Sequence, residues 1–299
     1  MNLFDRLVDQ ALTQNAELAS LRVVVEKELL HHDILLALSE AGLLERLCFI
    51  GGTCLRACYG SNRLSEDLDF TGGSDFRRED LAQLSTTLID KLQSKYGLLV
   101  EVSEPSKETG NVDTWKLRIQ TRPEAKHLPA QRINIDVCAI PTHRSRPQTL
   151  RNPYGVDMGT QGLILNAETL EEIYVDKILA FVLRRGRIKN RDLWDLLWLK
   201  QQGVQPELQL LPIKLDDHRV PVQDFLARAG ERMAALASDP QVKQDFRNEM
   251  QRFLPPRIVA ETVHSDRFWD YLAAEIPALV RQAVERLGGA APAAEGFLM

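Results

Sequence analysis

Two aspartates separated by one residue have side chains and a spacing that could bind a cation. Asp67 and Asp69 lie in a segment where polar and apolar residues alternate with the period of a β-strand. Side chains on a strand alternate between its faces, so both carboxylates project to one side while Leu68 and Phe70 face the core. Two such carboxylates repel each other unless a cation neutralises them, and their hard oxygen atoms suit Mg²⁺ or Mn²⁺. An isolated Asp-x-Asp is also compatible with a solvated surface.

A glycine pair lies a short distance upstream of these acids. Gly51-Gly52-Thr53 stands between an apolar segment, 47–50, which predicts a buried strand, and residues 53–59, which predict a helix. Glycines let a phosphate approach the backbone, and free N–H groups at a helix start bind anions. A simple tight turn would have the same sequence, so the triplet alone decides nothing.

A third acid follows later in the chain. In Ile133-Asn134-Ile135-Asp136-Val137 the apolar residues share one strand face, which leaves Asp136 on the opposite, polar face. Asp136 could there complete a carboxylate triad with Asp67 and Asp69. The alternative is an ordinary aspartate at the edge of a sheet.

The elements that must position these residues follow from hydrophobic periodicity. Strands are predicted at 47–50, 67–70, 98–102, 115–120, 133–140 and 163–165, with a Pro/Arg-rich loop at 141–153. Helices are predicted over most of 1–45 and at 53–59, 76–97, 169–185, 190–202, 221–237, 240–253 and 267–287. We therefore expect an α/β domain with N-terminal helices at 1–166, a helical domain at 167–287 and a disordered tail at 288–299.

Composition excludes several classes of protein. Of the 299 residues, 44% are hydrophobic and 26% charged, which is typical of a globular chain and unlike a disordered or collagenous one. No apolar run reaches the length of about 20 residues that a membrane span needs, and no secretory leader precedes the first helix. Four cysteines are too few for a disulfide framework. We expect a cytoplasmic protein with reduced thiols.

The charge distribution bears on nucleic-acid binding. The net charge of −5 gives no general support for binding a polyanion, so such a role needs a local basic patch. Two segments qualify by composition. Residues 116–151 contain eight basic side chains against two acids, and residues 184–191 contain five basic side chains. A solvated surface is the alternative interpretation of both. The basic side chains are Lys116, Arg118, Arg122, Lys126, Arg132, Arg144, Arg146 and Arg151, then Arg184, Arg185, Arg187, Lys189 and Arg191.

Four segments of the sequence resemble motifs of a known family. Residues 49–56, FIGGTCLR, followed by residues 63–70, RLSEDLDF, resemble the first motif of the AbiEii/AbiGii-type nucleotidyltransferase toxins. These are the toxins of bacterial abortive-infection and toxin–antitoxin pairs and are related to the mycobacterial MenT enzymes. Residues 175–180, VDKILA, and 191–196, RDLWDL, resemble the family's later motif. The resemblance spans about residues 45–200, and Leu64 departs from it where an aromatic residue is more usual.

The resemblance implies a fold and a reaction. The fold would be the α+β, DNA polymerase β-like nucleotidyltransferase fold, a mixed sheet with flanking helices and a C-terminal helical region. The reaction would join the α-phosphate of an NTP to a hydroxyl group and release pyrophosphate, with two metal ions, Mg²⁺ or Mn²⁺, at the reacting oxygens.

The resemblance also assigns roles to residues. Asp67 and Asp69 would be metal ligands, and Asp136 a third ligand or the general base. Lys177 would supply charge to the triphosphate, with Asp192 and Asp195 orienting Lys177 or binding the nucleotide. The remaining nucleotide contacts would come from Gly51, Gly52 and Thr53 and, less directly, from Arg56, Arg63 and Ser65.

The expected function is that of a growth-arresting toxin. The acceptor would be RNA, most simply the 3′ end of a tRNA, and a cognate antitoxin would be a partner, with no role for a membrane. Two alternatives remain open at the level of sequence. The acceptor could be a small molecule or a protein, or the chain could be a nucleotide- or RNA-binding module without turnover.

Overall fold

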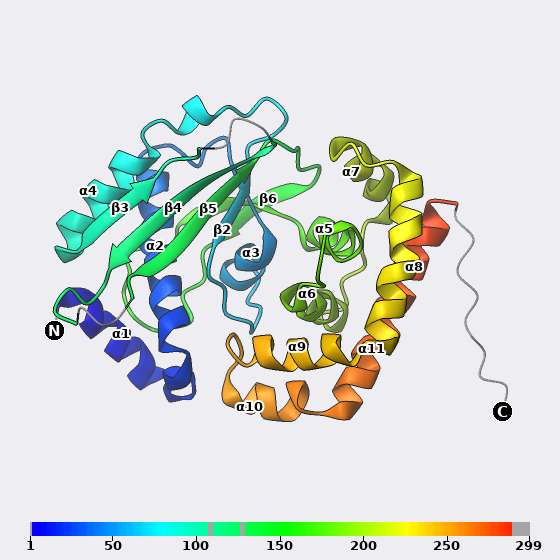
Figure 1. Cartoon of the computed structure of the whole chain (residues 1–299). Helices are drawn as coiled ribbons and strands as arrows, with labels where there is room; N and C mark the ends of the chain where they lie inside the picture. Colours follow the sequence, from blue (N-terminus) through cyan, green and yellow to red (C-terminus); the bar gives the residue numbers. More distant parts are fainter. Residues whose placement is uncertain (1, 107–109, 126–128, 289–299) are drawn as a thin grey trace. The chain divides into compact units, whose positions relative to one another are not determined.

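The sheet that carries the predicted acids belongs to the first of two structural units. The computed structural model describes residues 2–106, 110–125 and 129–288 (Figure 1). Unit 1 contains the chain up to Thr169 together with Phe253–Pro256, and unit 2 contains Leu170–Arg252 and the chain from Arg257 onward. The predicted boundary at residue 166 falls inside the last strand of unit 1. The predicted tail, 288–299, lies outside the described residues except for Gly288.

Unit 1 is built on one mixed sheet with the strand order β3-β4-β5-β2-β1-β7-β6. The pairs β2/β5 and β1/β7 are parallel, and the other neighbouring strands are antiparallel. The α+β expectation of a mixed sheet with flanking helices is confirmed. The strands are β1 Cys48–Ile50, β2 Leu68–Thr71, β3 Leu99–Ser103, β4 Val112–Gln120, β5 Gln131–Cys138, β6 Ser145–Thr149 and β7 Ile164–Glu168.

One strand lies where a loop was predicted. The Pro/Arg-rich segment 141–153 contains β6, which pairs with β7 at the edge of the sheet. Four of the five side chains of β6 are exposed, so this strand has no buried face to produce an apolar alternation. Its Pro147 is tolerated because an edge strand needs only one row of backbone partners.

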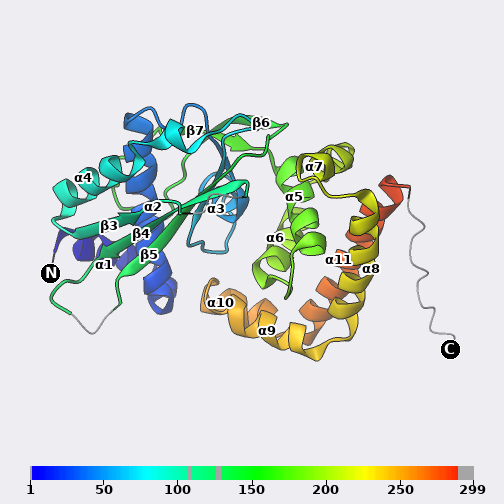
Figure 2. The ribbon, with the colours of Figure 1, turned by 45° about the horizontal axis from the view of Figure 1, so that its top comes forward.

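Alternating burial separates the two faces of the sheet. On β5 the residues Ile133, Ile135 and Val137 are buried and the residues between them are half-buried or exposed. Helices α2 and α4 lie side by side on the apolar face (Figures 1 and 2). The opposite face of β4 and β5 carries their polar side chains. The helices of unit 1 are α1 Leu3–Gln14, α2 Arg22–Glu40, α3 Gly51–Ala57 and α4 Leu84–Tyr96, with 3₁₀ turns at Ala16–Leu21 and Arg78–Leu81.

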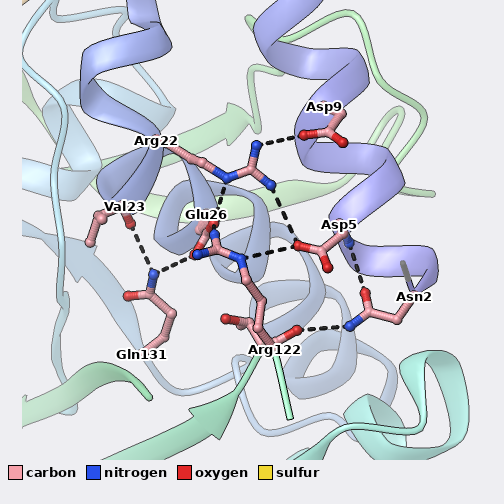
Figure 3. Close-up of polar contacts among 9 residues, drawn as sticks. Asn2, Asp5, Asp9, Arg22, Val23, Glu26, Arg122 and Gln131 are labelled. Atoms are coloured by element: carbon pink, nitrogen blue, oxygen red, sulfur yellow. Dashed lines mark hydrogen bonds and ion pairs between the residues drawn. The ribbon is translucent and has the colours of Figure 1, made fainter. Parts of the chain in front are cut away.

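A buried polar network ties the N-terminal helices to the sheet (Figure 3). Arg122, just after β4, forms ion pairs with Asp5 of α1 and Glu26 of α2. Gln131 of β5 donates to the Glu26 carboxylate at 2.6 Å, and Arg22 also pairs with both acids. Arg122 therefore does not belong to an exposed basic patch, which corrects the interpretation of 116–151 from composition. Lys126 of the same segment lies outside the described residues.

Unit 2 is helical over its described residues. Its two N-terminal helices, α5 and α6, lie side by side (Figure 2). Within the described part of the chain, no helix is both long enough and apolar enough to cross a membrane. The helices are α5 Leu170–Leu183, α6 Asn190–Gln201, α7 Leu211–Asp217, α8 Val222–Ser238, α9 Pro240–Met250, α10 Pro256–Ile258 and α11 Asp266–Arg286, with a 3₁₀ turn at Leu208–Leu210 and a π-helical turn at Val259–Val263.

Candidate active site

Strand register brings two of the predicted acids together in unit 1. Asp69 of β2 stands directly opposite Asp136 of β5 in the parallel pair, so both side chains project from the same face of the sheet. Asp67 lies one residue before β2, and its Oδ1 accepts a hydrogen bond from the backbone N–H of Asn134 at 3.0 Å. All three aspartates are neither fully buried nor fully exposed. The segment Asp67–Asp69 and the polar face of β5 therefore form one acidic site.

Gly51 borders this site and has a reason to be glycine. Its φ is +75°, in the left-handed region, and a Cβ atom at this position would lie 2.8 Å from Oδ2 of Asp69. The absence of a side chain lets the start of α3 pass against the carboxylate. The glycine pair that sequence analysis linked to phosphate binding thus lies beside the predicted metal ligand.

Thr53 and Ser65 act inside the protein rather than at its surface. The Thr53 hydroxyl lies 2.7 Å from Ser65 Oγ and also within hydrogen-bonding reach of the Asp67 carbonyl. Both side chains are buried. Their geometry connects the first turn of α3 to the segment that leads into the two aspartates, so these residues shape the acidic site.

A buried glutamate that sequence analysis did not single out holds the same segment. Glu28 of α2 accepts hydrogen bonds from the Ser65 backbone N–H at 2.8 Å and from Arg56 Nε at 3.0 Å. The Tyr154 hydroxyl also donates to Glu28. The sequence held no sign that distinguishes Glu28, because α2 also buries Glu26 and Asp33.

This cluster is strongly coupled electrostatically. Burial alone would lower the pKa of Arg56, but the neighbouring Glu28 carboxylate raises it above its ordinary value. Burial and the same carboxylate raise the pKa of Tyr154 well above 10. Arg56 is therefore a fixed cation bonded to Glu28 and to the Ser61 carbonyl. Arg63 is also buried and donates to the Leu64 carbonyl at 3.0 Å.

The acidic site fits a divalent cation in part. Mg²⁺ is usually held by one or two carboxylates together with phosphate oxygens of a substrate. Asp69 and Asp136 at matched register supply such a pair, and Gly51 leaves room at Asp69. Among the described residues, no three or more His, Cys, Asp or Glu side chains form a cluster arranged for a metal ion. The donor set therefore suits a cation that a bound phosphate helps to hold.

Basic side chains share the face that bears Asp136. In the register of β4 and β5, Thr114 is opposite Asp136, Lys116 is opposite Asn134, and Arg118 is opposite Arg132. Lys116, Arg118 and Arg132 are all exposed, and Arg118 pairs with the equally exposed Glu101. Of the basic segment 116–151, these three residues extend from the acidic site along its own strands.

The residues of the later motif form a compact ion cluster within unit 2. The ammonium group of Lys177 on α5 lies 2.8 Å from Asp192 Oδ1 and 2.8 Å from Asp195 Oδ2 on α6. All three side chains are buried. Asp192 and Asp195 are three residues apart and so share one face of their helix. The two carboxylates thus pair with the Lys177 ammonium group.

The charge of Lys177 also lowers the pKa of Asp192. Burial alone would raise the pKa of Asp192, but the charges of Lys177 and Lys189 outweigh burial and lower that pKa below its ordinary value. Burial lowers the pKa of Lys189. Arg184, at the end of α5, lies 3.3 Å from the second oxygen of Asp192. Asp192 is thus an ionised carboxylate shared by two cations.

The chain matches the model of a known protein family. Residues 33–274 match the family model described as nucleotidyl transferase AbiEii toxin, type IV TA system. The chain belongs to this family. The match spans both the acidic site and the Lys177 cluster of this AbiEii protein, and it identifies the chain as a nucleotidyltransferase toxin of type IV toxin–antitoxin systems.

A solved structure shows the same fold. The AbiEii protein is similar to MenT4, a nucleotidyltransferase toxin from Mycobacterium tuberculosis H37Rv, with a TM-score of 0.56 and 17% identity over 93% of this chain and 89% of that one. It is also similar to JHP933 from Helicobacter pylori, with a TM-score of 0.46 and 17% identity over 88% of this chain and 94% of that one. No curated protein sequence matches it significantly.

Proposed function

We propose that this toxin transfers a nucleoside monophosphate from an NTP to a hydroxyl group of an RNA, with the 3′ end of a tRNA as the expected acceptor. The oxygen of the acceptor hydroxyl attacks the α-phosphorus, the bond between the α-phosphorus and the bridging oxygen breaks, and pyrophosphate leaves. The observation that carries the proposal is the Asp69–Asp136 pair at matched register beside Gly51, in a chain of the AbiEii family. The reaction belongs in the cytoplasm, where NTPs and tRNA are found.

The residues of unit 1 have distinct roles in this proposal. Asp69 and Asp136 would hold Mg²⁺ or Mn²⁺ together with phosphate oxygens of the NTP, and the ion would neutralise charge at the reacting oxygens. Asp67, whose Oδ1 accepts from the Asn134 N–H, would position this pair. Asp136 would accept the proton of the attacking hydroxyl, as an alternative to ligating the cation. Gly51 and Gly52 let the β- and γ-phosphates approach the backbone. Thr53, Ser65, Arg56 and Arg63 support this arrangement from inside the protein, in place of the direct nucleotide contacts expected from sequence.

Lys177 contributes a positive charge to the triphosphate, and Asp192 and Asp195 keep its ammonium group in place. A lysine is a suitable partner here because it acts as a point charge that tolerates several phosphate orientations. Growth arrest would follow from loss of usable acceptor RNA, and a cognate antitoxin, as in type IV systems, would prevent it.

The basic row on β4 and β5 favours an RNA acceptor over a small molecule. Lys116, Arg118 and Arg132 stand on the same strands and the same face as Asp136. Exposed cations in line with a reacting centre suit the phosphates of a polynucleotide. A small acceptor would need no such extension of the site.

A single labelling experiment tests the proposal. The protein is incubated with total RNA, Mg²⁺ and each α-phosphate-labelled NTP in turn, and the products are separated on a gel. We expect one NTP to label a band of tRNA size, and chelation of the metal or the substitution Asp69→Asn to abolish the label. Labelling of a small molecule or of protein would replace the RNA acceptor, and no label with any acceptor would contradict transferase activity.

A further inference from the structure

An arginine-lined hollow lies in unit 2, beside the Lys177 cluster. The C-terminal end of α5 and the exposed side of α8 form it, with a volume of about 420 Å³, which is within the usual range for ligand sites. Four arginines, Arg184, Arg185, Arg228 and Arg232, line the hollow against a single carboxylate, Glu231. Such an excess of like charge in one concave surface favours an anionic ligand.

Two of these arginines are anchored by the end of α5. Arg228 donates to the Leu183 carbonyl at 3.0 Å, and Arg232 donates to the Gly186 carbonyl at 2.8 Å and to the Arg184 carbonyl. Leu183 is the last residue of α5, so the Arg228 bond caps the helix, and the Arg232 bonds hold the turn that follows it. A guanidinium has five N–H donors, and most donors of both groups remain for a ligand. Capping alone does not explain the arginines that surround them.

Of the other two arginines, Arg184 contacts the Lys177 cluster and Arg185 is exposed to solvent. Arg184 lies 3.3 Å from Asp192, whose other oxygen contacts Lys177, so the hollow adjoins the Lys177 cluster. Arg185 is exposed and has no hydrogen-bond or ion-pair partner within the described part of the chain. Arg187, which is also exposed, continues the basic surface beyond the hollow.

We propose that this hollow binds the phosphodiester backbone of the acceptor RNA, an inference that rests on the proposed RNA acceptor. Guanidinium groups match phosphate oxygens with paired donors. Apart from the five charged residues, only Gly186 and Ala235 line the hollow, so no aromatic or large apolar surface is present to hold a base. The chemistry therefore suits a chain of phosphates, recognised without regard to sequence, better than a free nucleotide.

The test measures RNA affinity against salt concentration. The ligand is an RNA hairpin with a blocked 3′ end, so that binding is separated from transfer. The double variant Arg185→Gln/Arg232→Gln removes two cations while keeping amide donors. We expect its log–log salt slope to be shallower than that of the wild type by about 1.4–1.8, because each lost phosphate contact changes the slope by about 0.7–0.9. Arg267→Gln, at an exposed arginine outside the hollow, is the matched control and should leave the slope unchanged.

A second variant covers the possibility that Arg232 is needed for folding. Arg185→Gln alone alters no contact within the described residues. Its log–log salt slope should be shallower than that of the wild type by about 0.7–0.9. If RNA binding by the wild type depends steeply on salt and both variants have the same slope, the proposal that the hollow binds RNA is wrong. The proposed RNA acceptor would stand. An unchanged slope with weakened NTP use would make the hollow a triphosphate site, and an unchanged slope with loss of an acidic protein partner would make it a protein interface. A salt-independent wild type would overturn the RNA acceptor itself.

Discussion

At the scale of single residues, the acid pair makes the clearest prediction. Asp69→Asn or Asp136→Asn should abolish nucleotide transfer, because each change removes one carboxylate of the pair that stands at matched register. Stability without metal should be unchanged or slightly higher, since two neighbouring carboxylates repel each other. Transfer activity and the thermal midpoint of each variant check this. Asp90→Asn, an exposed aspartate on α4, is the control, and full activity in either site variant would remove that residue from the site.

The Glu28 cluster makes a second prediction at this scale. Glu28→Gln removes the charge that pairs with Arg56 and should lower the stability of the fold by about 3–5 kcal/mol, as expected for one partner of a buried ion pair. Because Glu28 also holds the Ser65 backbone, the folded variant should lose about 10- to 100-fold in kcat through misplacement of the aspartates, with little change in KM.

Tyr154→Phe is the matched control for that change. It removes one hydrogen bond to Glu28 but leaves those from Arg56 and Ser65. Its cost should be about 1 kcal/mol in stability, with kcat close to the wild-type value. Equal kinetic losses in both variants would mean that general packing, rather than the position of Ser65, carries the effect.

The acid pair Asp69 and Asp136 was predicted from the sequence, and the Glu28 cluster was not. The apolar alternation around Asp136 determines which face its side chain occupies, and an alternating strand needs no tertiary information for that. Its alignment with Asp69 depends on which strands become neighbours, because β5 precedes β2 in the sheet order although it follows β2 in the chain. Glu28 has no motif around it, and only the packing of α2 against α3 and the Ser65 segment gives it a role.

At the scale of elements, the α5–α6 ion cluster predicts a pH-dependent stability. Lys177→Met leaves Asp192 and Asp195 buried without their common cation and should cost about 3–5 kcal/mol near pH 7. The folded pKa of Asp192 is below its unfolded value, so its contribution to stability is present above about pH 4 and is lost as the pH falls through the folded pKa. Urea unfolding at several pH values should therefore show the wild type and the variant converging below about pH 4.

A compensating change separates stability from chemistry in this cluster. Lys177→Met/Asp195→Asn removes one of the two carboxylates that the first change leaves unpaired, and should recover part of the lost stability. Transfer should stay low, because the charge for the triphosphate is still missing. Recovery of activity together with stability would show that Lys177 acts only as a structural cation.

Local periodicity predicted most elements, and the exceptions β6 and α7 have different causes. Helices α5, α6, α8 and α11 were predicted close to their observed bounds. The apolar residues of α8 and α11 form a regular stripe. Strand β6 was missed because its side chains are exposed and its stability comes from backbone pairing with β7. Helix α7 has only seven residues, which is too short for a clear helical period.

At the scale of the whole molecule, net charge opposes RNA binding and local cations must overcome it. Arg144, Arg146 and Arg187 are exposed, and their reversal to glutamate should weaken RNA binding and reduce its salt dependence, because phosphate contacts release counterions. Binding of a fluorescent NTP should not change. RNA affinity against salt for the wild type and the triple variant is the measurement.

Three other exposed arginines serve as the control for that variant. Reversal of Arg219, Arg267 and Arg286, all exposed, changes the net charge by the same amount outside both basic segments. If this control lost as much affinity as the first variant, the effect would come from net charge alone. Full transfer activity in the first variant would favour an acceptor other than RNA.

Because Phe253–Pro256 belongs to unit 1, one cut cannot divide the chain into its two units. The Leu64 backbone N–H donates to the Phe253 carbonyl at 2.9 Å, and the side chains of Phe253 and Leu254 are buried. A fragment that stops at Thr169 lacks this piece of its own core and should expose apolar surface and aggregate. A single protease cut after Thr169 would not release either unit, because the polypeptide passes between them again at Arg252 and at Pro256. Unit 2 is therefore a long excursion from a unit that the chain completes only after residue 252.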